Sequence, residues 1–343
     1  MKREIKMPDV STKTLRWGIL STANIATTIS RAINASPNTQ LLAIASRDLN
    51  RAQTWATEHG AQRAYGSYDE LLTDPDIDAV YIPLPPSMHA EWTIKAAANN
   101  KHVLCEKPLA LNLTQAQAMV DACQANNVQL MDGVMWVHHQ RTHMMKAHID
   151  NGDLGPLRRV TVGFSFNWDE IPTANIRTKS DLGGGSLGDL GYYCARAILW
   201  ALQDMPTAVY ATARYVDGVD FNLSALLWFA DQRMASFDCS FDTVGRRWFE
   251  IAGTTGSLVC DDFVSPQSVE KARYWLHGPD GKEGEYAAHD CLQVANMIET
   301  FTAIVQTGQL DPYWPQQALE TTRICQALSI SAQRQERVEL NAK

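Results

Sequence analysis

The sequence predicts an α/β protein of two domains, in which a parallel sheet covered by helices precedes a mostly antiparallel sheet. The chain has 343 residues, which is long for one compact domain and long enough for two hydrophobic cores. Short apolar runs alternate with helical patterns from residue 15 to about 131, as in parallel sheets with crossover helices. After about residue 150, apolar and polar residues alternate strictly, which is typical of strands with one buried face.

The first domain contains five strand candidates, at residues 15–20, 41–45, 77–82, 102–105 and 128–131. Apolar residues recur at helical spacing in residues 25–33, so we expect a helix there that packs on the sheet, with Asn24 as its N-cap. Two later helices carry the spacing of a capping box, at Ser67 with Glu70 and at Thr114 with Gln117.

The second domain opens with the alternating residues 160–168. Further strand candidates follow at 208–216, 223–229, 233–241, 248–252 and 273–277. Helical patterns return at 290–307 and at about 315–333, where Pro315 suits a first helical position. We therefore expect a dinucleotide-binding type of domain over 13–135 and a second α/β domain over 136–343.

Composition and charge exclude several classes of protein. The 38 acidic residues outnumber the 30 lysines and arginines, for a net charge of −8, so no nucleic-acid partner is expected. The seven cysteines are scattered without a CxxC pair, which predicts reduced thiols and a cytoplasmic protein. Residues 1–14 carry charges instead of the apolar core of a signal peptide, and no later stretch approaches ~18 uninterrupted apolar residues. We expect no membrane segment.

The turn after the first strand, residues 18–26, lies where a dinucleotide-binding fold brings its backbone close to a pyrophosphate. Such a turn needs small residues, and the free amides of the next helix point at the phosphates. The GxGxxG fingerprint is absent, because Ser21, Ala23 and Ala26 occupy its glycine positions. Small side chains still allow close approach, but Ser21 must adopt the turn without the freedom of glycine. An ordinary strand-to-helix turn is the alternative.

The end of the second strand predicts which dinucleotide binds. Roughly 20 residues after the phosphate turn, an acidic residue usually contacts the adenosine ribose of NAD. Here Ser46 and Arg47 offer a hydroxyl and a fork of N–H donors to a 2′-phosphate, which favours NADP. Asp48 keeps NAD open, since it could contact a free ribose or cap the following helix. An ordinary surface arginine is the alternative interpretation of Arg47.

Two further segments carry candidate acid–base groups. Lys107 follows a strand and should lie at the carboxyl end of the parallel sheet, where such folds bind ligands. A glycine-rich turn precedes a helix on which Asp189 and Tyr193 share a face. A tyrosine has an ordinary pKa near ~10, so proton transfer at neutral pH needs a nearby cation and hydrogen-bond partners. Lys107 and Asp189 could supply these. A surface lysine paired with Glu106 and a packing tyrosine are the alternatives.

Together these segments resemble the Gfo/Idh/MocA family of oxidoreductases. The matching stretches run through nearly the whole chain in order, at residues 17–26, 45–48, 81–110, 175–177, 182–194 and 249–257. The chain is most similar to the branch that holds D-xylose dehydrogenases, dimeric dihydrodiol dehydrogenase and glucose-fructose oxidoreductase. The resemblance implies an N-terminal Rossmann domain with a doubly wound parallel sheet and a C-terminal α/β domain with an open, mostly antiparallel sheet. It also implies a homodimer or higher homo-oligomer built through the second sheet.

The resemblance assigns roles to individual residues. The lysine of the family's EKP motif matches Lys107, its helix aspartate matches Asp189, and its acid–base residue matches Tyr193. In similar enzymes the peptide bond before the EKP proline, here Pro108, is often cis. The residues expected to contact the cofactor are Ser21, Thr22, Ala23, Asn24, Ile25, Ser46, Arg47, Pro83, Leu84, His89, Glu106 and Lys107.

The candidate substrate-side residues are Trp136, His139, Asn175 and Arg177. His139 and His143 have the spacing of a helical metal pair, but no third ligand is evident, so we expect no metal site. Relatives differ from this chain in residues 131–140, which leaves the identity of the substrate open.

These observations predict an NADP-dependent oxidoreductase that transfers a hydride between nicotinamide and a small sugar, polyol or cyclic diol, with NAD as the other candidate cofactor. In the oxidation direction Tyr193, its pKa lowered by Lys107, takes the hydroxyl proton. Asp189 holds the substrate hydroxyl or orients Tyr193. Two other functions are compatible with the fold: a glycosidase that retains NAD(H), and a dinucleotide-dependent sensor without enzymatic activity.

Overall fold

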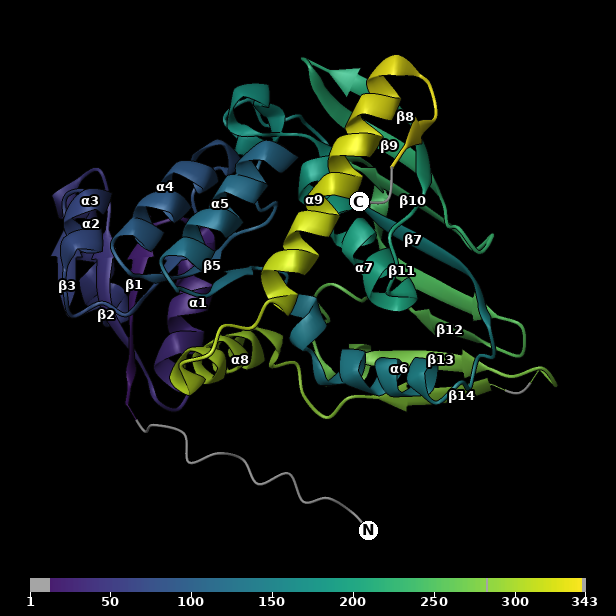
Figure 1. Ribbon diagram of the computed structural model, residues 1–343, viewed down its shortest axis with the longest axis horizontal. Coiled ribbons are helices and arrows are strands. Elements are labelled where there is room, and N and C mark those ends of the chain that lie inside the picture. The colour runs from purple at the N-terminus through teal and green to yellow at the C-terminus, as the bar shows by residue number, and fades with distance from the viewer. Residues whose placement is uncertain (1–12, 282, 341–343) are drawn as a thin grey trace, which may run out of the picture.

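The structure of the protein, a computed structural model, describes residues 13–281 and 283–340 (Figure 1). Residues 1–12, whose charges argue against a signal peptide, and residues 341–343 of the second predicted domain lie outside the described residues. Within the described part of the chain, no helix is both long enough and apolar enough to cross a membrane. None of the seven cysteines forms a disulfide, in agreement with the prediction of reduced thiols.

The first domain is built on a parallel sheet of six strands in the order β3-β2-β1-β4-β5-β6. The strands are β1 (Leu15–Leu20), β2 (Thr39–Ala45), β3 (Arg63–Tyr65), β4 (Ala79–Ile82), β5 (His102–Cys105) and β6 (Leu130–Asp132). This order confirms the doubly wound sheet and leaves a crevice beyond the carboxyl ends of β1 and β4, where the winding reverses. The sequence did not predict β3, because its three residues are too few to show a period.

Five helices connect these strands: α1 (Asn24–Ala35), α2 (Leu49–His59), α3 (Tyr68–Thr73), α4 (Pro86–Ala98) and α5 (Leu113–Ala125). The expected cap at Ser67 is confirmed, since its hydroxyl accepts a hydrogen bond from the backbone N–H of Glu70 at 3.2 Å. Two other capping predictions are wrong. Asn24 is the first residue inside α1, and α5 is capped by Asn112 instead of Thr114 because the helix begins at Leu113.

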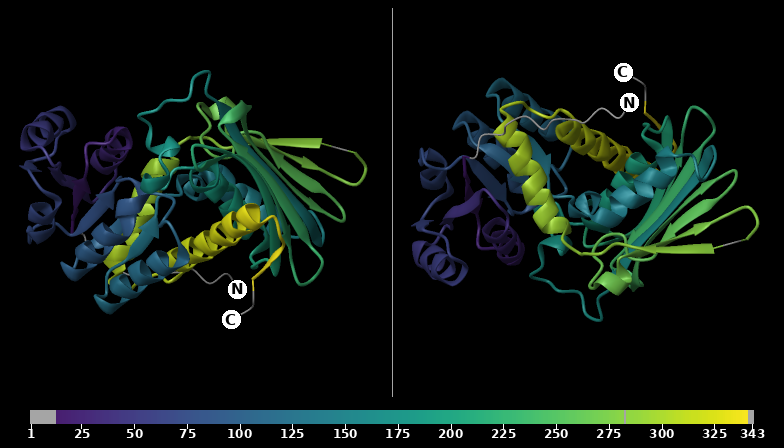
Figure 2. Two further views of the ribbon diagram at one scale, coloured as in Figure 1. Left: turned by 90° about the horizontal axis from the view of Figure 1, so that it is seen from above. Right: turned by 90° about the horizontal axis from the view of Figure 1, so that it is seen from below.

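The second domain has a sheet of nine strands in the order β14-β13-β12-β11-β7-β10-β9-β8-β15. Only the pair β10 and β7 is parallel, so the prediction of a mostly antiparallel sheet is confirmed. The strands are β7 (Leu157–Asn167), β8 (Ala208–Val216), β9 (Val219–Trp228), β10 (Met234–Ser240), β11 (Asp242–Gly253), β12 (Ser257–Cys260), β13 (Arg273–His277), β14 (Glu283–Ala287) and β15 (Val338–Glu339). One face of this sheet packs on helices and the other is open (Figure 2).

Four helices follow the first domain: α6 (Gln140–Asp150), α7 (Tyr192–Leu202), α8 (Gln293–Thr307) and α9 (Tyr313–Arg334). Although α8 and α9 come late in the chain, they pack on the first domain (Figure 1). The ring of Phe301 in α8 lies 5.0 Å from that of Trp17 in β1, and Ala318 of α9 joins the core around α5. Since α9 begins at Tyr313, Pro315 is its third residue and not its first.

A buried ion pair connects the two domains. Asp132, at the end of β6, accepts a hydrogen bond from Arg196 of α7 at 2.6 Å, and both side chains are at most 2% exposed. The same carboxylate oxygen accepts the Tyr192 hydroxyl at 2.9 Å, and the Arg196 Nε donates to Thr321 of α9 at 2.7 Å. These partners lie on β6, α7 and α9, so the ion pair fixes how the two helices dock on the first sheet.

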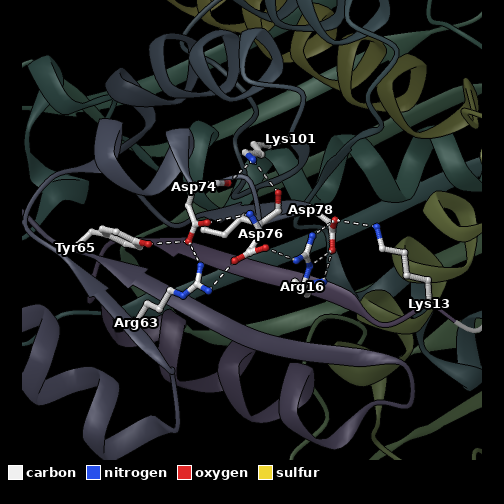
Figure 3. A network of polar contacts seen from close by, with 9 residues as sticks. Lys13, Arg16, Arg63, Tyr65, Asp74, Asp76, Asp78 and Lys101 are labelled. Atoms are coloured by element: carbon white, nitrogen blue, oxygen red, sulfur yellow. Dashed lines mark hydrogen bonds and ion pairs between the residues drawn. The ribbon is translucent and has the colours of Figure 1, made fainter.

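A second polar network ties together the opposite, amino end of the first sheet (Figure 3). Arg16 of β1 pairs with Asp78 at 2.9 Å, and Arg63 of β3 pairs with Asp74 at 2.6 Å. The buried ammonium of Lys101 donates to the carbonyl oxygens of Asp74 and Ile77, at 2.7 and 2.8 Å. These bonds anchor the loop between α3 and β4 at the end of the sheet that faces away from the crevice.

The ion pair between Asp132 and Arg196 gives a prediction about stability. Arg196→Met should lower the free energy of unfolding by about 3–5 kcal/mol, because it leaves a buried carboxylate without a counter-charge. Urea denaturation measures the change. The matched control is Arg334→Met, which removes the exposed pair with Glu336 and should cost less than about 1 kcal/mol. Equal costs for the two variants would contradict the role given to the buried pair.

Candidate active site

The turn between β1 and α1 forms one wall of a cavity at the carboxyl end of the first sheet. Ser21 has a φ of 127°, a conformation that favours glycine, so the missing glycine leaves a strained residue there. Ala23 is the N-cap of α1 and provides no side-chain acceptor, so the first backbone N–H groups of the helix are available to a ligand. A helix N-terminus of this kind favours an anion such as a phosphate.

The three polar residues after β2 have different partners. The hydroxyl of the buried Ser46 accepts a hydrogen bond from the backbone N–H of Asp48 at 3.3 Å. The Asp48 carboxylate accepts the N–H groups of Asn50 (2.9 Å) and Arg51 (3.3 Å) and so caps α2. Arg47 is exposed, and its guanidinium has no partner among the described residues. The acidic side chain is thus engaged by the helix, while the arginine faces solvent.

The three residues after β5 turn into the cavity. Glu106 accepts the Tyr81 hydroxyl at 2.6 Å through one oxygen and the backbone N–H of Lys107 at 3.2 Å through the other. The carboxylate lies against Gly133, where a Cβ would be only 2.9 Å away. Burial raises the pKa of Glu106, and the charge of Lys107 opposes this effect. The peptide bond between Lys107 and Pro108 is cis, as the resemblance implied.

The glycine run before α7 is shaped by Asp220 of β9. Gly185 has a φ of 123°, and a Cβ there would lie 2.2 Å from the Oδ1 of Asp220, so only glycine fits. The other oxygen of Asp220 accepts the hydroxyl of Ser186 at 2.8 Å and the N–H of Leu187 at 2.6 Å. Asp220 thereby caps the π-helical turn Leu187–Gly191, which leads directly into α7.

Asp189, in this π-helical turn, joins two cations. The Nζ of Lys107 lies 2.6 Å from one oxygen of Asp189, and the Nε of Arg177 lies 2.5 Å from the other. The side chains of Lys107 and Asp189 are only 12% and 13% exposed, so water screens this pair weakly. Burial opposes ionisation of Asp189, but the two cations outweigh it and hold its pKa below the usual value.

Tyr193 lies one turn further, at the start of α7, and is buried. Its ring packs edge-on against Phe164 with centroids 5.6 Å apart, and the Nζ of Lys107 is 4.9 Å from its ring centroid. Its hydroxyl has no hydrogen-bond partner in the part of the chain that the structure describes. Burial, followed by the charges of Glu106 and Asp189, raises the pKa of Tyr193 well above its usual value. The sequence-based expectation of a lowered pKa is wrong, because burial disfavours the phenolate and the carboxylates of Glu106 and Asp189 add to this effect.

Two cavities meet at these residues. The first has a volume of about 420 Å³ and lies between the β1–α1 turn and the glycine run. The second has a volume of about 460 Å³ and lies against the inner face of β7 and β11. Four side chains line both cavities, namely Lys107, Arg177, Asp189 and Tyr193. A ligand in the first cavity and a ligand in the second would therefore meet at these four side chains.

The structure brings many of the expected cofactor residues to the first cavity. Those that line it are Ala23, Asn24, Ile25, Pro83, Leu84, Glu106 and Lys107, whereas Ser21, Thr22, Ser46, Arg47 and His89 do not. His89 is fully buried below it, and its ring nitrogens lie 2.9 and 2.8 Å from the carbonyl oxygens of Pro108 and Leu84. This histidine holds two cavity-lining loops together.

Of the expected substrate-side residues, Arg177 lines these two cavities, and Trp136, His139 and Asn175 do not. Trp136 is fully buried in an aromatic cluster, with ring centroids 5.5 Å from Trp200 and 5.4 Å from Phe263. His139 is also fully buried and accepts the N–H of Arg141 at the start of α6. Asn175 accepts the N–H of Arg177 at 3.0 Å, so it shapes the loop that carries the arginine.

The sequence did not identify several residues of the second cavity, namely Phe164, Ser165, Phe166, Gly245, Arg247 and Val264. The alternation in residues 160–168 predicted a half-buried strand, but no signal in the sequence tells which face of it packs against α7. Arg247 lies just before the strand predicted at 248–252 and belongs to β11, which begins earlier, at Asp242.

Comparison with known proteins identifies the family. Residues 15–134 match the family described as "Oxidoreductase family, NAD-binding Rossmann fold", and residues 142–259 match the "GFO/IDH/MocA C-terminal domain". These two matches cover more than half of the chain in the expected order. The chain belongs to the Gfo/Idh/MocA oxidoreductase family, as its motifs indicated.

Individual relatives are similar over most of their length. The chain is 34% identical over 332 residues to a D-xylose 1-dehydrogenase (NADP(+)) of Haloferax volcanii, covering 95% of this chain and 100% of the relative. It is 32% identical over 260 residues to the trans-1,2-dihydrobenzene-1,2-diol dehydrogenase of Mus musculus, covering 74% and 77% of the two chains. A 3-ketoreductase from Actinomadura kijaniata, crystallised with NADP and TDP-benzene, superimposes with a TM-score of 0.86 at 28% identity, covering 93% and 98% of the two chains.

The clamp formed by Asp220 gives a prediction about pH. Burial raises the pKa of Asp220 from 3.8 to about 6, so between these values the folded protein binds a proton that the unfolded chain releases. Stability contributed by this proton is present below pH 4 and is lost as the pH rises through about 6.

Asp220→Asn keeps the shape of the side chain and removes this titration. Between pH 4 and pH 7, the free energy of unfolding of the wild type should fall relative to that of the variant, by at most about 3 kcal/mol. Urea denaturation at several pH values measures the difference. A difference that stays constant across this range would contradict the raised pKa.

Proposed function

We propose that the protein is an NADP-dependent oxidoreductase that transfers a hydride between nicotinamide and a hydroxyl-bearing carbon of a sugar, polyol or cyclic diol. One observation carries this proposal: Lys107, Arg177, Asp189 and Tyr193 form the wall shared by two cavities. This arrangement suits a reaction in which cofactor and substrate bind in separate cavities and react where the cavities meet.

The first cavity and the exposed residues after β2 together fit a dinucleotide. The uncapped N-terminus of α1 offers free amides to a pyrophosphate, and the unpaired guanidinium of Arg47 suits the 2′-phosphate of NADP. Asp48 caps α2 through its Oδ1, which accepts both N–H groups. When bound, the nicotinamide accepts or donates the hydride, and the protein provides binding and orientation.

Tyr193 is proposed to carry the proton. Its raised pKa keeps the hydroxyl protonated at neutral pH, so in carbonyl reduction it donates this proton to the oxygen that becomes the substrate hydroxyl. In the reverse direction Tyr193 must first lose its proton; its phenolate oxygen then takes the proton of the substrate hydroxyl, and a carbonyl remains once the hydride has left. The ammonium of Lys107 stabilises negative charge on the reacting oxygen, and Asp189 holds that ammonium in position.

The printed activities of the relatives support the substrate class. The Haloferax volcanii relative is named for D-xylose and NADP(+), and the Mus musculus relative for a cyclic trans-diol. Both molecules carry hydroxyl groups on neighbouring carbons, as the proposed sugars, polyols and cyclic diols do.

For assembly we propose a homodimer through the outer face of the second sheet. Two large apolar side chains on this face are exposed, Leu226 at 45% and Met234 at 44%, on the neighbouring strands β9 and β10. Contact with a second copy would remove this apolar surface from water.

The proton-transfer role gives a prediction about activity. Tyr193→Phe should lower kcat/KM by about 10²–10⁴-fold, because it removes the proton donor and leaves the ring in place. Steady-state reduction of NADP⁺ with a panel of aldoses, polyols and cyclic diols measures the loss, and fluorescence titration of NADPH checks that the dissociation constant changes less than about threefold.

Its matched control is Tyr192→Phe, which removes a neighbouring hydroxyl that only contacts Asp132 and the backbone oxygen of Ala318. This control should retain kcat/KM within about threefold, because the hydroxyl does not face either cavity. Full activity of Tyr193→Phe would overturn the proposed function.

The cofactor preference is tested at Arg47. Arg47→Leu should lower the ratio of NADP⁺ to NAD⁺ in kcat/KM by about 10–100-fold, because a charge-assisted hydrogen bond to the 2′-phosphate is lost. Parallel initial-rate measurements with the two cofactors give the ratio. Arg51→Leu, which removes an exposed arginine one turn away on α2, should leave the ratio unchanged. An unchanged ratio in Arg47→Leu would show that another group distinguishes the 2′-phosphate of NADP from the 2′-hydroxyl of NAD.

A further inference from the structure

The second cavity is positively charged, although the protein as a whole carries a net charge of −8. Its charged lining residues are the cations Lys107, Arg177 and Arg247 and the single carboxylate Asp189. Both oxygens of Asp189 are already engaged, one by Lys107 and one by Arg177. Three cations against one carboxylate leave an excess of two positive charges. Arg247 contributes to this excess, and the proposed reaction does not use it.

Arg247 projects to the same face of the second sheet as the catalytic wall. In the ladder between β11 and β7 it lies directly opposite Phe164, whose ring packs against Tyr193. Side chains opposite each other on antiparallel strands have Cβ atoms about 5 Å apart, so the guanidinium can reach beside a substrate held at Tyr193. Its neighbour Arg246 faces the other side of the sheet, where it bonds Ser165 and Asp238.

The guanidinium of Arg247 is only partly balanced. Its Nε lies 3.4 Å from the carboxylate of Asp262, and among the described residues its side chain makes no hydrogen bond. The terminal nitrogens, which form the fork that matches a carboxylate or phosphate, are thus unengaged. The side chain is 39% exposed, so a ligand entering the cavity can contact it without rearrangement.

We infer that the substrate is an anionic sugar derivative, whose carboxylate or phosphate binds Arg247 while its reacting carbon lies at Tyr193. This inference rests on the proposed function and narrows its substrate class. The apolar side chains of Phe164, Phe166 and Val264 line the space between the two ends, where a sugar ring would lie. A neutral sugar would leave Arg247 with its contact to Asp262 at 3.4 Å and would not engage the terminal nitrogens.

Binding to the NADPH-loaded protein tests the inference without requiring turnover. Titrations with D-glucose, D-glucose 6-phosphate and D-glucuronate compare a neutral sugar with its phosphate and carboxylate forms. We expect at least one anion to bind tenfold or more tightly than glucose, with an affinity that falls as ionic strength rises. The phosphate and carboxylate arms distinguish the two anion types.

Variants at Arg247 assign the preference to this side chain. Arg247→Met should reduce the ratio of anionic to neutral affinity by about tenfold or more, and Arg247→Lys should retain part of it because the charge remains without the fork. Arg158→Met, which removes an exposed arginine of β7 outside both cavities, should leave the ratio as in the wild type.

The outcomes separate this inference from the proposed function. Equal binding of the neutral and anionic sugars, no measurable binding of either, or an anion preference that survives Arg247→Met, overturns the inference. If the protein turns over neutral sugars alone, the proposed oxidoreductase activity is supported and the inference of an anionic substrate is wrong. Anion binding that depends on Arg247 but is accompanied by no NADP⁺-dependent turnover of any sugar supports the anion site and removes the oxidoreductase activity.

Discussion

The buried ion pair between Asp132 and Arg196 is the constraint on which the rest of the site depends. It joins the last strand of the first sheet to α7, the helix whose first turn carries Tyr193. Separating two charges in an apolar interior is costly, so the interface has one favoured arrangement. That arrangement brings Asp189, from the second domain, within 2.6 Å of Lys107, from the first. The side chains shared by the two cavities are therefore brought together by the docking of the two domains and not by one loop.

The cations of the site differ in their partners: Lys107 and Arg177 pair with Asp189, and Arg247 does not. Asp189 accepts both Lys107 and Arg177 and holds these two cations in place, but its single charge balances only one of them. Burial is the largest effect on the pKa of Tyr193, and the charges of Glu106 and Asp189 add to it, so the tyrosine keeps its proton. A group that holds its proton until a more basic oxygen forms beside it is well suited to act as an acid. Arg247 takes no part in this cluster; it lines the second cavity and has the carboxylate of Asp262 3.4 Å from its Nε.

Sequence alone predicted the parts of this molecule that depend on local pattern. The two kinds of sheet follow from hydrophobic periodicity, and Lys107, Asp189 and Tyr193 follow from motifs whose neighbours are close in the chain. Arg247 could not be predicted, because the ladder between β11 and β7 shifts register between Asp242 and Arg246, and this shift decides which face the arginine takes. Burial of Trp136 and His139 is likewise set by packing of distant aromatic and helical segments, which leave no local signature.

The packing of the C-terminal helices α8 and α9 on the first domain affects how the chain folds during synthesis. Phe301 covers Trp17, and Ala318 completes the core beside α5, so the earliest strands have no full cover until the last helices are made. At a ribosomal rate of about 5–20 residues per second, this apolar surface stays open for on the order of ten seconds. The core of the first domain is therefore not complete until the residues of α8 and α9 have been made. A truncation that removes only the final helices would be expected to impair the nucleotide-side domain at the far end of the chain.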